Sequence, residues 1–176
     1  LKDANSGDAL TLTVNGTTAT AKDLISLDGK TTAITLNVGA ITGNITEITK
    51  VFVDDAANFT NVGTAAATIS GEITAAQADA IADVTSKVVT ATIKADTADN
   101  LKTALSDTDV NAYKLTVSGE TADAADLNAL DALTSVTVNA AAIKNIEGTA
   151  TAVKAAYDAN ANKDISGLGN ETVNLK

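Results

Sequence analysis

The chain has 176 residues, with 12 Lys and Arg together against 22 Asp and Glu, and a formal net charge of −10 at pH 7. This charge argues against nucleic-acid binding, which needs a basic stripe. The chain contains no His and no Cys. The commonest acid–base and nucleophilic pairs therefore cannot be built, and disulfides and thiolate metal sites are excluded. The acidic residues are spread along the chain without a convergent set, so we expect no enzyme.

Large side chains are scarce, because the chain has two Phe, two Tyr, no Met and no Trp. The core must then be thin and aliphatic, which suits a stack of narrow coils better than a large globular core. No apolar run approaches the roughly 20 residues that a bilayer crossing requires, so we expect no membrane span.

A tetrapeptide with Thr at its second position recurs along the chain, and the gaps between these threonines run from 21 to 35 residues. Recurrence in this range is typical of a solenoid. The seven copies are Leu12–Asn15, Ile34–Asn37, Ala67–Ser70, Ala91–Lys94, Leu115–Ser118, Val136–Asn139 and Glu171–Asn174.

A longer repeat of about 104 residues lies on top of the short one. Thr13 and Thr116 are 103 residues apart, and Thr68 and Thr172 are 104 apart. The segment 58–63 is likewise echoed by the segment 164–169. We therefore treat the chain as a single solenoid fragment cut from a longer array. Its expected coils are roughly 10–33, 34–66, 67–88, 89–113, 114–135, 136–170 and a partial 171–176.

In the first half of the chain, each strand motif is followed by a helical pattern. A short helix is expected over 19–27, and an apolar helical face is formed by Ile41, Ile45, Ile48, Val51 and Phe52. An extra loop follows at 54–62, where we expect Phe59 to fill the space beneath it.

The later helices carry recognisable start signals. Thr74 followed by Gln77 matches a capping box, and a further helix is expected from about Thr97 to Leu105. Thr121 is the expected cap of the next helix. In the last long coil, Tyr157 takes roughly the place of Phe52.

Strands in successive coils that are each followed by a helix must run parallel, with right-handed crossovers. The sequence therefore predicts an α/β fold, a right-handed β-α solenoid of about seven coils. It would be leucine-rich-repeat-like, with one parallel sheet and the helices on its other side. The aliphatic residues that flank each Thr would point inward, and the threonines outward.

The outward threonines form the candidate binding surface. A flat Thr array resembles the surfaces of ice-binding proteins, and the same face could hold a polysaccharide. Lys94 would interrupt a flat surface, and Thr also suits any solvent-facing β position. The expected ladder is Thr13, Thr35, Thr68, Thr92, Thr116, Thr137 and Thr172.

A weak calcium candidate lies at Asp158, Asn160, Asn162 and Asp164, where oxygen ligands alternate as calcium prefers. Lys163 stands where such a loop needs Gly, and Gly169 where it needs a bidentate Glu. The alternative is a polar loop without a cation, and no other cofactor is indicated.

Residues 121–134 and 164–173, with the strands around them, resemble the internal repeats of giant bacterial secreted or cell-surface proteins. These include haemolysin-type and S-layer-like proteins and those of marine cyanobacteria. The resemblance implies a stalk, spacer or surface-layer role outside the cell. The calcium-binding nonapeptide of haemolysin-type proteins is absent.

We therefore expect a non-catalytic structural spacer segment of a large extracellular protein. Its partners would be neighbouring repeats of the same chain, with cell-envelope polysaccharide or self-association as further candidates. Two alternatives stay open: a binding module that uses the Thr face for glycan, ice or surface adhesion, and a phage fibre segment.

Overall fold

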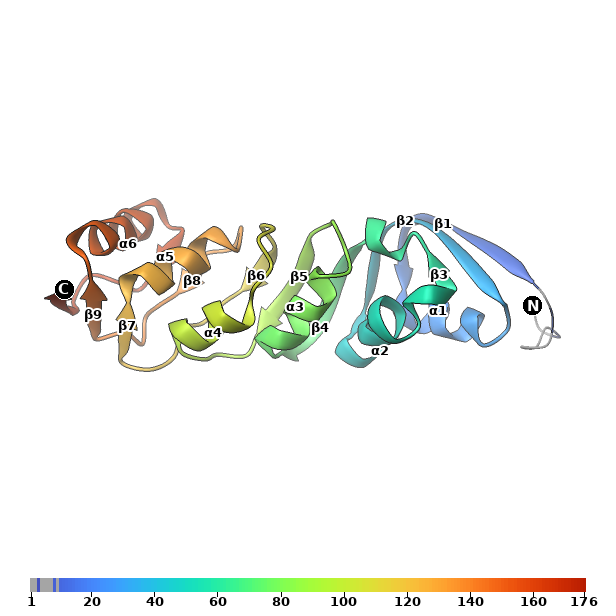
Figure 1. Ribbon diagram of the computed structural model, residues 1–176, viewed down its shortest axis with the longest axis horizontal. Helices are drawn as coiled ribbons and strands as arrows, with labels where there is room; N and C mark the ends of the chain where they lie inside the picture. Colours follow the sequence, from blue (N-terminus) through green and yellow to red (C-terminus); the bar gives the residue numbers. More distant parts are fainter. Residues whose placement is uncertain (1–2, 4–7, 9) are drawn as a thin grey trace. The chain divides into compact units, whose positions relative to one another are not determined.

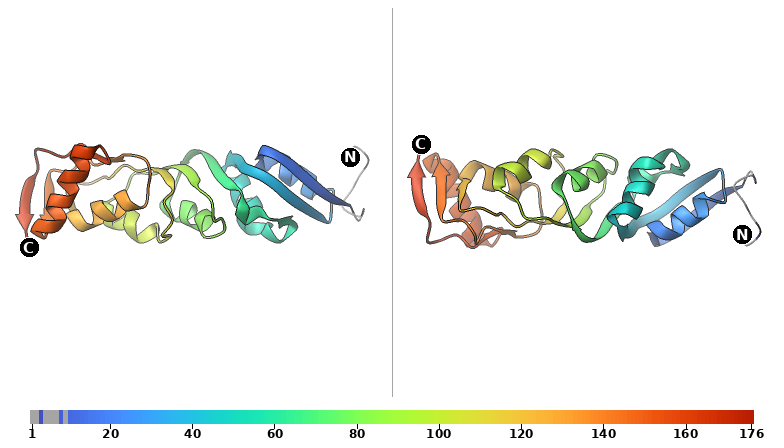
Figure 2. Two further views of the ribbon diagram at one scale, coloured as in Figure 1. Left: turned by 90° about the horizontal axis from the view of Figure 1, so that it is seen from above. Right: turned by 90° about the horizontal axis from the view of Figure 1, so that it is seen from below.

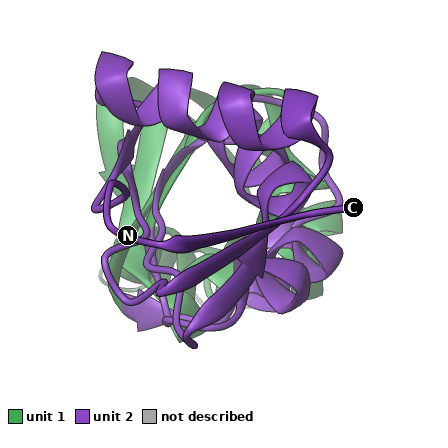
Figure 3. Ribbon diagram, turned by 90° about the vertical axis from the view of Figure 1, so that its left-hand side faces the viewer, with its two compact units in different colours: residues 1–71, 80–91 green, residues 72–79, 92–176 purple. Residues whose placement is uncertain are grey.

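The computed structural model describes residue 3, residue 8 and residues 10–176. The chain divides into two compact units, coloured separately in Figure 3. Unit 1 comprises residues 1–71 and 80–91, and unit 2 comprises residues 72–79 and 92–176.

Strands and helices follow one another along the described chain, in the order labelled in Figure 1. Unit 1 contains β1 (Thr11–Thr20), α1 (Ala21–Asp28), β2 (Ala33–Asn44), α2 (Ile45–Thr49), the π-helix η1 (Lys50–Asp54), the 3₁₀ turns η2 (Ala56–Asn58) and η3 (Val62–Thr64), and β3 (Phe59–Thr60). The chain passes between the units within β4 (Ala66–Ile73), α3 (Ala75–Ala82) and β5 (Val89–Ile93). Unit 2 continues with α4 (Ala98–Ala104), β6 (Ala112–Lys114), β7 (Thr121–Asp123), α5 (Ala124–Ala132), β8 (Val138–Asn139), β9 (Asn145–Gly148), α6 (Ala150–Asn162), β10 (Ile165–Ser166) and β11 (Thr172–Leu175).

The fold is a mixed α/β arrangement whose strands are mostly parallel, as the sequence predicts. The strand pairs β1–β2, β2–β3, β2–β4, β7–β9, β8–β10 and β9–β11 are all parallel. The single continuous sheet of seven equivalent strands is not confirmed. The described strands form a six-stranded sheet of order β1-β2-β4-β5-β6, with β3 beside β2, and two further sheets of orders β10-β8 and β11-β9-β7.

The register in unit 1 differs from the predicted one, because each long strand crosses two rows of aligned threonines. In the first row Thr13 pairs with Thr35, and Thr35 pairs with Thr60. In the second row Thr20 pairs with Thr42, and Thr42 pairs with Thr68. The sequence motif had placed Thr68 beside Thr35. In the structure Thr68 aligns with a residue seven positions further along β2.

The same two rows recur in unit 2 at the spacing of the long repeat. The first row contains Thr116, Asn139 and Ser166. The second row contains Thr121, Asn145 and Thr172. Each position of a row in unit 2 therefore follows its counterpart in unit 1 by about one long repeat.

The two rows of unit 2 belong to separate sheets because the chain turns between them. Gly16 lies within β1, whereas its repeat equivalent Gly119 has a φ of +87° and interrupts the extended backbone. A turn also separates β8 from β9. The broken sheet therefore follows from local backbone conformation rather than from a different order of elements.

The core is thin and aliphatic, as expected. In the motifs at Ile34, Ala67, Ala91 and Leu115, the residues on both sides of the Thr are buried. Val136 and Val173 depart from this pattern, since they are 37% and 42% exposed. Phe59 is 2% exposed, which agrees with its expected place beneath the loop at 54–62.

The helix starts follow the polar cap residues. The amide of Gln77 donates to the Thr74 hydroxyl at 3.2 Å, and the amide of Thr74 donates to Oε1 of Gln77 at 3.0 Å, which confirms the capping box. Thr97 caps α4 at the expected start of this helix. The assignment of Thr121 was wrong, because Thr121 lies in β7 and Asp123 caps α5.

Two buried threonines, Thr85 in unit 1 and Thr134 in unit 2, link neighbouring segments of their units. In unit 1 the Thr85 hydroxyl donates to the carbonyl of Ala65 at 2.7 Å. In unit 2 the Thr134 hydroxyl donates to the carbonyl of Tyr113 at 2.8 Å and accepts from its amide at 3.0 Å. Each hydroxyl thus forms a hydrogen bond with a buried backbone group that would otherwise need a backbone partner. The sequence analysis missed both residues, because they stand outside the repeated tetrapeptide.

Candidate functional site

The seven threonines of the predicted ladder all lie away from the core, but they do not form one row. Thr13 and Thr35 are direct neighbours, as expected. Thr68 belongs to the second row of unit 1, and Thr172 to the second row of unit 2. Thr116 pairs with Asn139 rather than with Thr137. Thr92 lies in β5, and the Thr137 hydroxyl donates to the carbonyl of Lys163 at 2.8 Å.

A shallow groove of about 440 Å³ follows the second row of unit 1. Thr20, Thr42 and Thr68 line it together with Lys22 and Glu47, but most of the exposed lining is apolar. Part of the polar lining is already engaged, since the Thr20 hydroxyl donates to Asp23 at 2.7 Å. The remaining lining residues are Gly43, Asn44 and Ser70.

The side-chain amides of Asn15 and Asn37 lie beside the first row, and Nδ2 of Asn37 donates to Oδ1 of Asn15 at 3.0 Å. Asn15 and Asn37 are the last residues of the first two tetrapeptides, and the strand register aligns them. It gives unit 1 a polar surface without aromatic residues, which differs from the aromatic lining of most carbohydrate sites.

A polar cavity of about 220 Å³ in unit 2 is lined by Asp131, Lys163 and Asp164 together with Thr134, Ser135, Val136 and Thr137. Burial raises the pKa of Asp131, and the negative charge of Asp164 raises it further. The charge of Asp164 thus disfavours the charged form of Asp131, and Lys163 is the cation of this cavity lining.

We expect Asp131→Asn to stabilise the protein at pH 7 by up to about 1 kcal/mol. A raised pKa means that the folded state binds the Asp131 proton more tightly than the unfolded state does. The wild type therefore gains stability as the pH falls through the folded pKa, and the advantage of the variant should disappear there. Thermal melts at pH 7 and at about pH 3.5, near the ordinary Asp pKa, measure this difference.

Asp109→Asn is the matched control, since it removes the same charge from an exposed position of unit 2. An equal gain in melting temperature in both variants would assign the effect to net charge rather than to the Asp131–Asp164 pair.

The predicted calcium loop is not a loop. Asp158, Asn160 and Asn162 lie in α6, and Lys163 closes this helix in a left-handed conformation. On a helix of 3.6 residues per turn, alternate side chains diverge instead of converging on one cation. Asp158 forms an ion pair with Lys154, and the amide of Asn160 is bonded to the backbone of Leu168. Within the described residues there is no group of three or more His, Cys, Asp or Glu that could hold a metal ion.

The segment that follows α6 is held by Tyr157 and Glu171. The Tyr157 hydroxyl donates to Glu171 at 2.8 Å, and the amide of Gly169 donates to both carboxylate oxygens. Burial and the adjacent carboxylate raise the pKa of Tyr157 to about 12. Desolvation acts to raise the pKa of Glu171, but the hydrogen bonds from Gly169 and Tyr157 lower it below its ordinary value. Tyr157 is only half-buried, whereas Phe52 is fully buried, so their environments differ.

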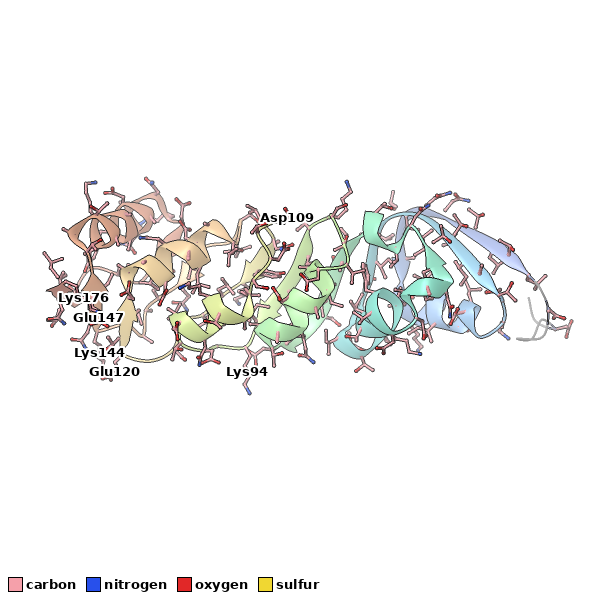
Figure 4. All side chains as sticks on the ribbon, in the orientation of Figure 1. Lys94, Asp109, Glu120, Lys144, Glu147 and Lys176 are labelled. Carbon is pink, nitrogen blue, oxygen red and sulfur yellow. The ribbon has the colours of Figure 1, made fainter. Side chains whose placement is uncertain are left out.

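Several lysines form ion pairs between neighbouring elements of unit 2. Lys102 lies 2.9 Å from Asp126, and Lys176 lies 3.1 Å from Glu147. Lys144 pairs with Glu120. Figure 4 labels the last two pairs at the C-terminal end of the chain. These pairs connect segments that are about one coil apart in the sequence, as paired strands are, so they hold neighbouring segments together rather than form a reactive cluster.

Comparison with known proteins gives no relative. No protein-family model matches the chain, no curated protein matches it, and no solved structure matches it. None of the helices in the described part of the chain has the length and apolar character that a bilayer crossing requires. The function must therefore be argued from the architecture alone.

Proposed function

We propose that the chain is a structural repeat segment, a β-α solenoid that acts as a spacer in a large extracellular bacterial surface protein. The observation that carries the proposal is the recurrence of the two-row pairing pattern. Thr13, Thr35 and Thr60 in unit 1 correspond to Thr116, Asn139 and Ser166 in unit 2. A repeat that pairs mainly with its neighbours can be extended without limit, which suits a spacer.

The chemistry of the chain supports the same proposal. Lys102, Lys144 and Lys176 form ion pairs between segments, and the chain has neither His nor Cys for common catalytic pairs. The excess of acidic residues favours solubility. Location outside the cell follows from the resemblance of residues 121–134 and 164–173 to repeats of secreted and cell-surface proteins.

An in-register extension of the chain tests the spacer proposal. In the long repeat Thr172 corresponds to Thr68, so residues 69–176 can be appended directly after residue 172 to add one further period. If four added coils stack at the strand spacing of about 4.8 Å, the maximum dimension in solution scattering should grow by about 20 Å. The free energy of unfolding should rise as well, because new interfaces between coils are added.

A much larger increase in length, without a gain in stability, would mean that the added period forms a separate globule or an unfolded tail. Either result would contradict the spacer proposal. Antibodies against the chain should label intact cells of the source, and labelling that requires permeabilised cells would contradict the extracellular location.

The groove along Thr20, Thr42 and Thr68 favours a second candidate function, binding of a polysaccharide. Lys22, Glu47 and the threonines supply a few hydrogen-bonding groups for sugar hydroxyls, and the largely apolar lining can contact the face of a sugar ring. A glycan array with the wild type and Thr42→Val tests this function, with Thr13→Val in the other row as the matched control. Binding that is lost only in Thr42→Val supports the groove, and thermal hysteresis without glycan binding would instead support ice adhesion.

A further inference from the structure

Strand pairing within each unit joins segments that are about one coil apart in the sequence. In the ladders β1–β2, β2–β3 and β2–β4 of unit 1, the paired residues are 22 to 26 positions apart. In the ladders β7–β9, β8–β10 and β9–β11 of unit 2, they are 24 to 27 positions apart. Figure 2 shows the same order in unit 2, where the colours from yellow through orange to red follow one another. None of these six ladders ties distant parts of the chain together.

The attachments between neighbouring coils are non-covalent. The chain has no Cys, so no disulfide joins one coil to the next. Besides the ladders, the buried Thr134 hydroxyl donates to Tyr113, and Lys102 forms its ion pair with Asp126. The helices follow the same rule, since α5 packs against α4 and α6. Each coil is thus held mainly by the coils directly before and after it, as in other repeat folds.

Tension along such a chain is borne by the junctions between coils. In a fold whose first and last strands are paired, a pull must shear the whole sheet at once. Here a pull can open the weakest junction while the remaining coils stay folded, because coupling extends mainly to the nearest neighbours. A coil of about 25 residues that opens adds about 8 nm of extended chain. The same coil can close again quickly, since its contacts are local in the sequence.

We propose that the chain is an extensible tether, which keeps its length at rest and lengthens under load as its coils open reversibly, one at a time. The proposal deepens the spacer function and rests on it, because only a segment that links two bodies carries tension between them. A sudden pull would then be absorbed in increments of about 8 nm per coil, without the loss of a whole domain.

Optical tweezers with handles at both ends of the full chain test the proposal. As the force rises, we expect successive steps of about 8 nm. The last step should be larger, because fewer than about three repeats are not stable alone, and relaxation should retrace the steps. Opening in one or two large steps, with none near about 8 nm, would overturn the tether. Such a result would leave the scattering test of the in-register extension unaffected, so the tether and the spacer proposals fail separately.

Two local changes show whether the coils open independently. Gly167→Ala places a Cβ against Ala141 beside the β8–β10 ladder, so it should lower the opening force of this junction alone. Asn15→Cys combined with Asn37→Cys replaces two side chains that lie 3.0 Å apart on neighbouring strands. The oxidised disulfide should remove one step of about 7 nm, and reduction should restore it. The other steps should keep their forces in both variants. A shift of all steps in either variant would mean that the coils open together, which would overturn the proposal.

Discussion

Replacing Phe52 by Ala should lower the free energy of unfolding by about 3–5 kcal/mol, the usual cost of truncating a fully buried aromatic residue. Phe52 is 0% exposed and lies in the π-helix η1, which packs against α1, α2 and the 3₁₀ turns of unit 1. With two Phe and two Tyr in the chain, few side chains could fill the resulting cavity. Urea denaturation followed by circular dichroism measures the loss, and hydrogen exchange should show faster opening of α1 and α2.

Val53→Ala provides the control for this substitution. Val53 is the next residue of the same π-helix and is 42% exposed. Its truncation should cost less than about 0.5 kcal/mol, as is usual for surface positions. Comparable losses in the two variants would mean that η1 does not bury Phe52 in solution as described.

In four of the seven motifs the sequence predicted which residues face the core, because alternation along a strand is a local property. Ile34 and Leu36 are buried on either side of Thr35, and Leu115 and Val117 on either side of Thr116. Helix starts at Thr74 and Thr97 were predictable for the same reason, since a cap acts over three residues.

The register could not be predicted, because it depends on which segments meet in space. Thr35 and Thr68 carry the same motif in successive copies, but Thr68 pairs with Thr42. The number of residues from Thr35 to Thr68 is therefore the sum of two parts. The first part runs along β2 from Thr35 to Thr42, and the second runs from Thr42 to its actual partner, Thr68. That separation is close to the one between Thr35 and Thr60, which are also paired. The irregular spacing of the motifs therefore concealed a more regular spacing of the paired residues.

The expectation of a loop at the calcium candidate was wrong for a related reason. The alternating Asp158, Asn160 and Asn162 satisfy a local ligand pattern, but six of the thirteen residues of α6 are Ala, which favours a helix. The Lys154–Asp158 pair at a spacing of four residues adds to this preference. None of the seven predicted threonines is buried, although Thr35, Thr92 and Thr116 are only half-exposed, and whether they bind a ligand stays a prediction.

The second large effect is expected from Gly167→Ala in the segment after β10. Gly167 has a φ of +92°, and a Cβ added there would lie 2.5 Å from Cα and 2.6 Å from N of Ala141. The backbone of Ala141 cannot move aside like a flexible side chain, since the adjacent amide of Ala140 donates to Ser166 O at 2.8 Å. We expect the variant to lose about 3 kcal/mol or more, the sum of left-handed strain and overpacking. Urea denaturation gives the loss, and amide chemical shifts of β8 and β10 show whether their pairing survives.

Two matched variants separate the clash from the strain. Gly169 also has a positive φ, +147°, but a Cβ there would meet nothing within 4 Å, so Gly169→Ala should cost only about 1–2 kcal/mol of backbone strain. Asn61 is the repeat counterpart of Gly167, and its φ is +71°. Asn61→Gly should change stability by less than about 1 kcal/mol, because both residues accept the left-handed region.

Equal losses in Gly167→Ala and Gly169→Ala would mean that backbone strain alone sets the cost. A larger loss in Gly167→Ala than in Gly169→Ala would show that the close approach of Ala141 restricts this position of unit 2 to glycine. The left-handed turn itself is common to both copies of the long repeat, since Asn61 adopts it in unit 1.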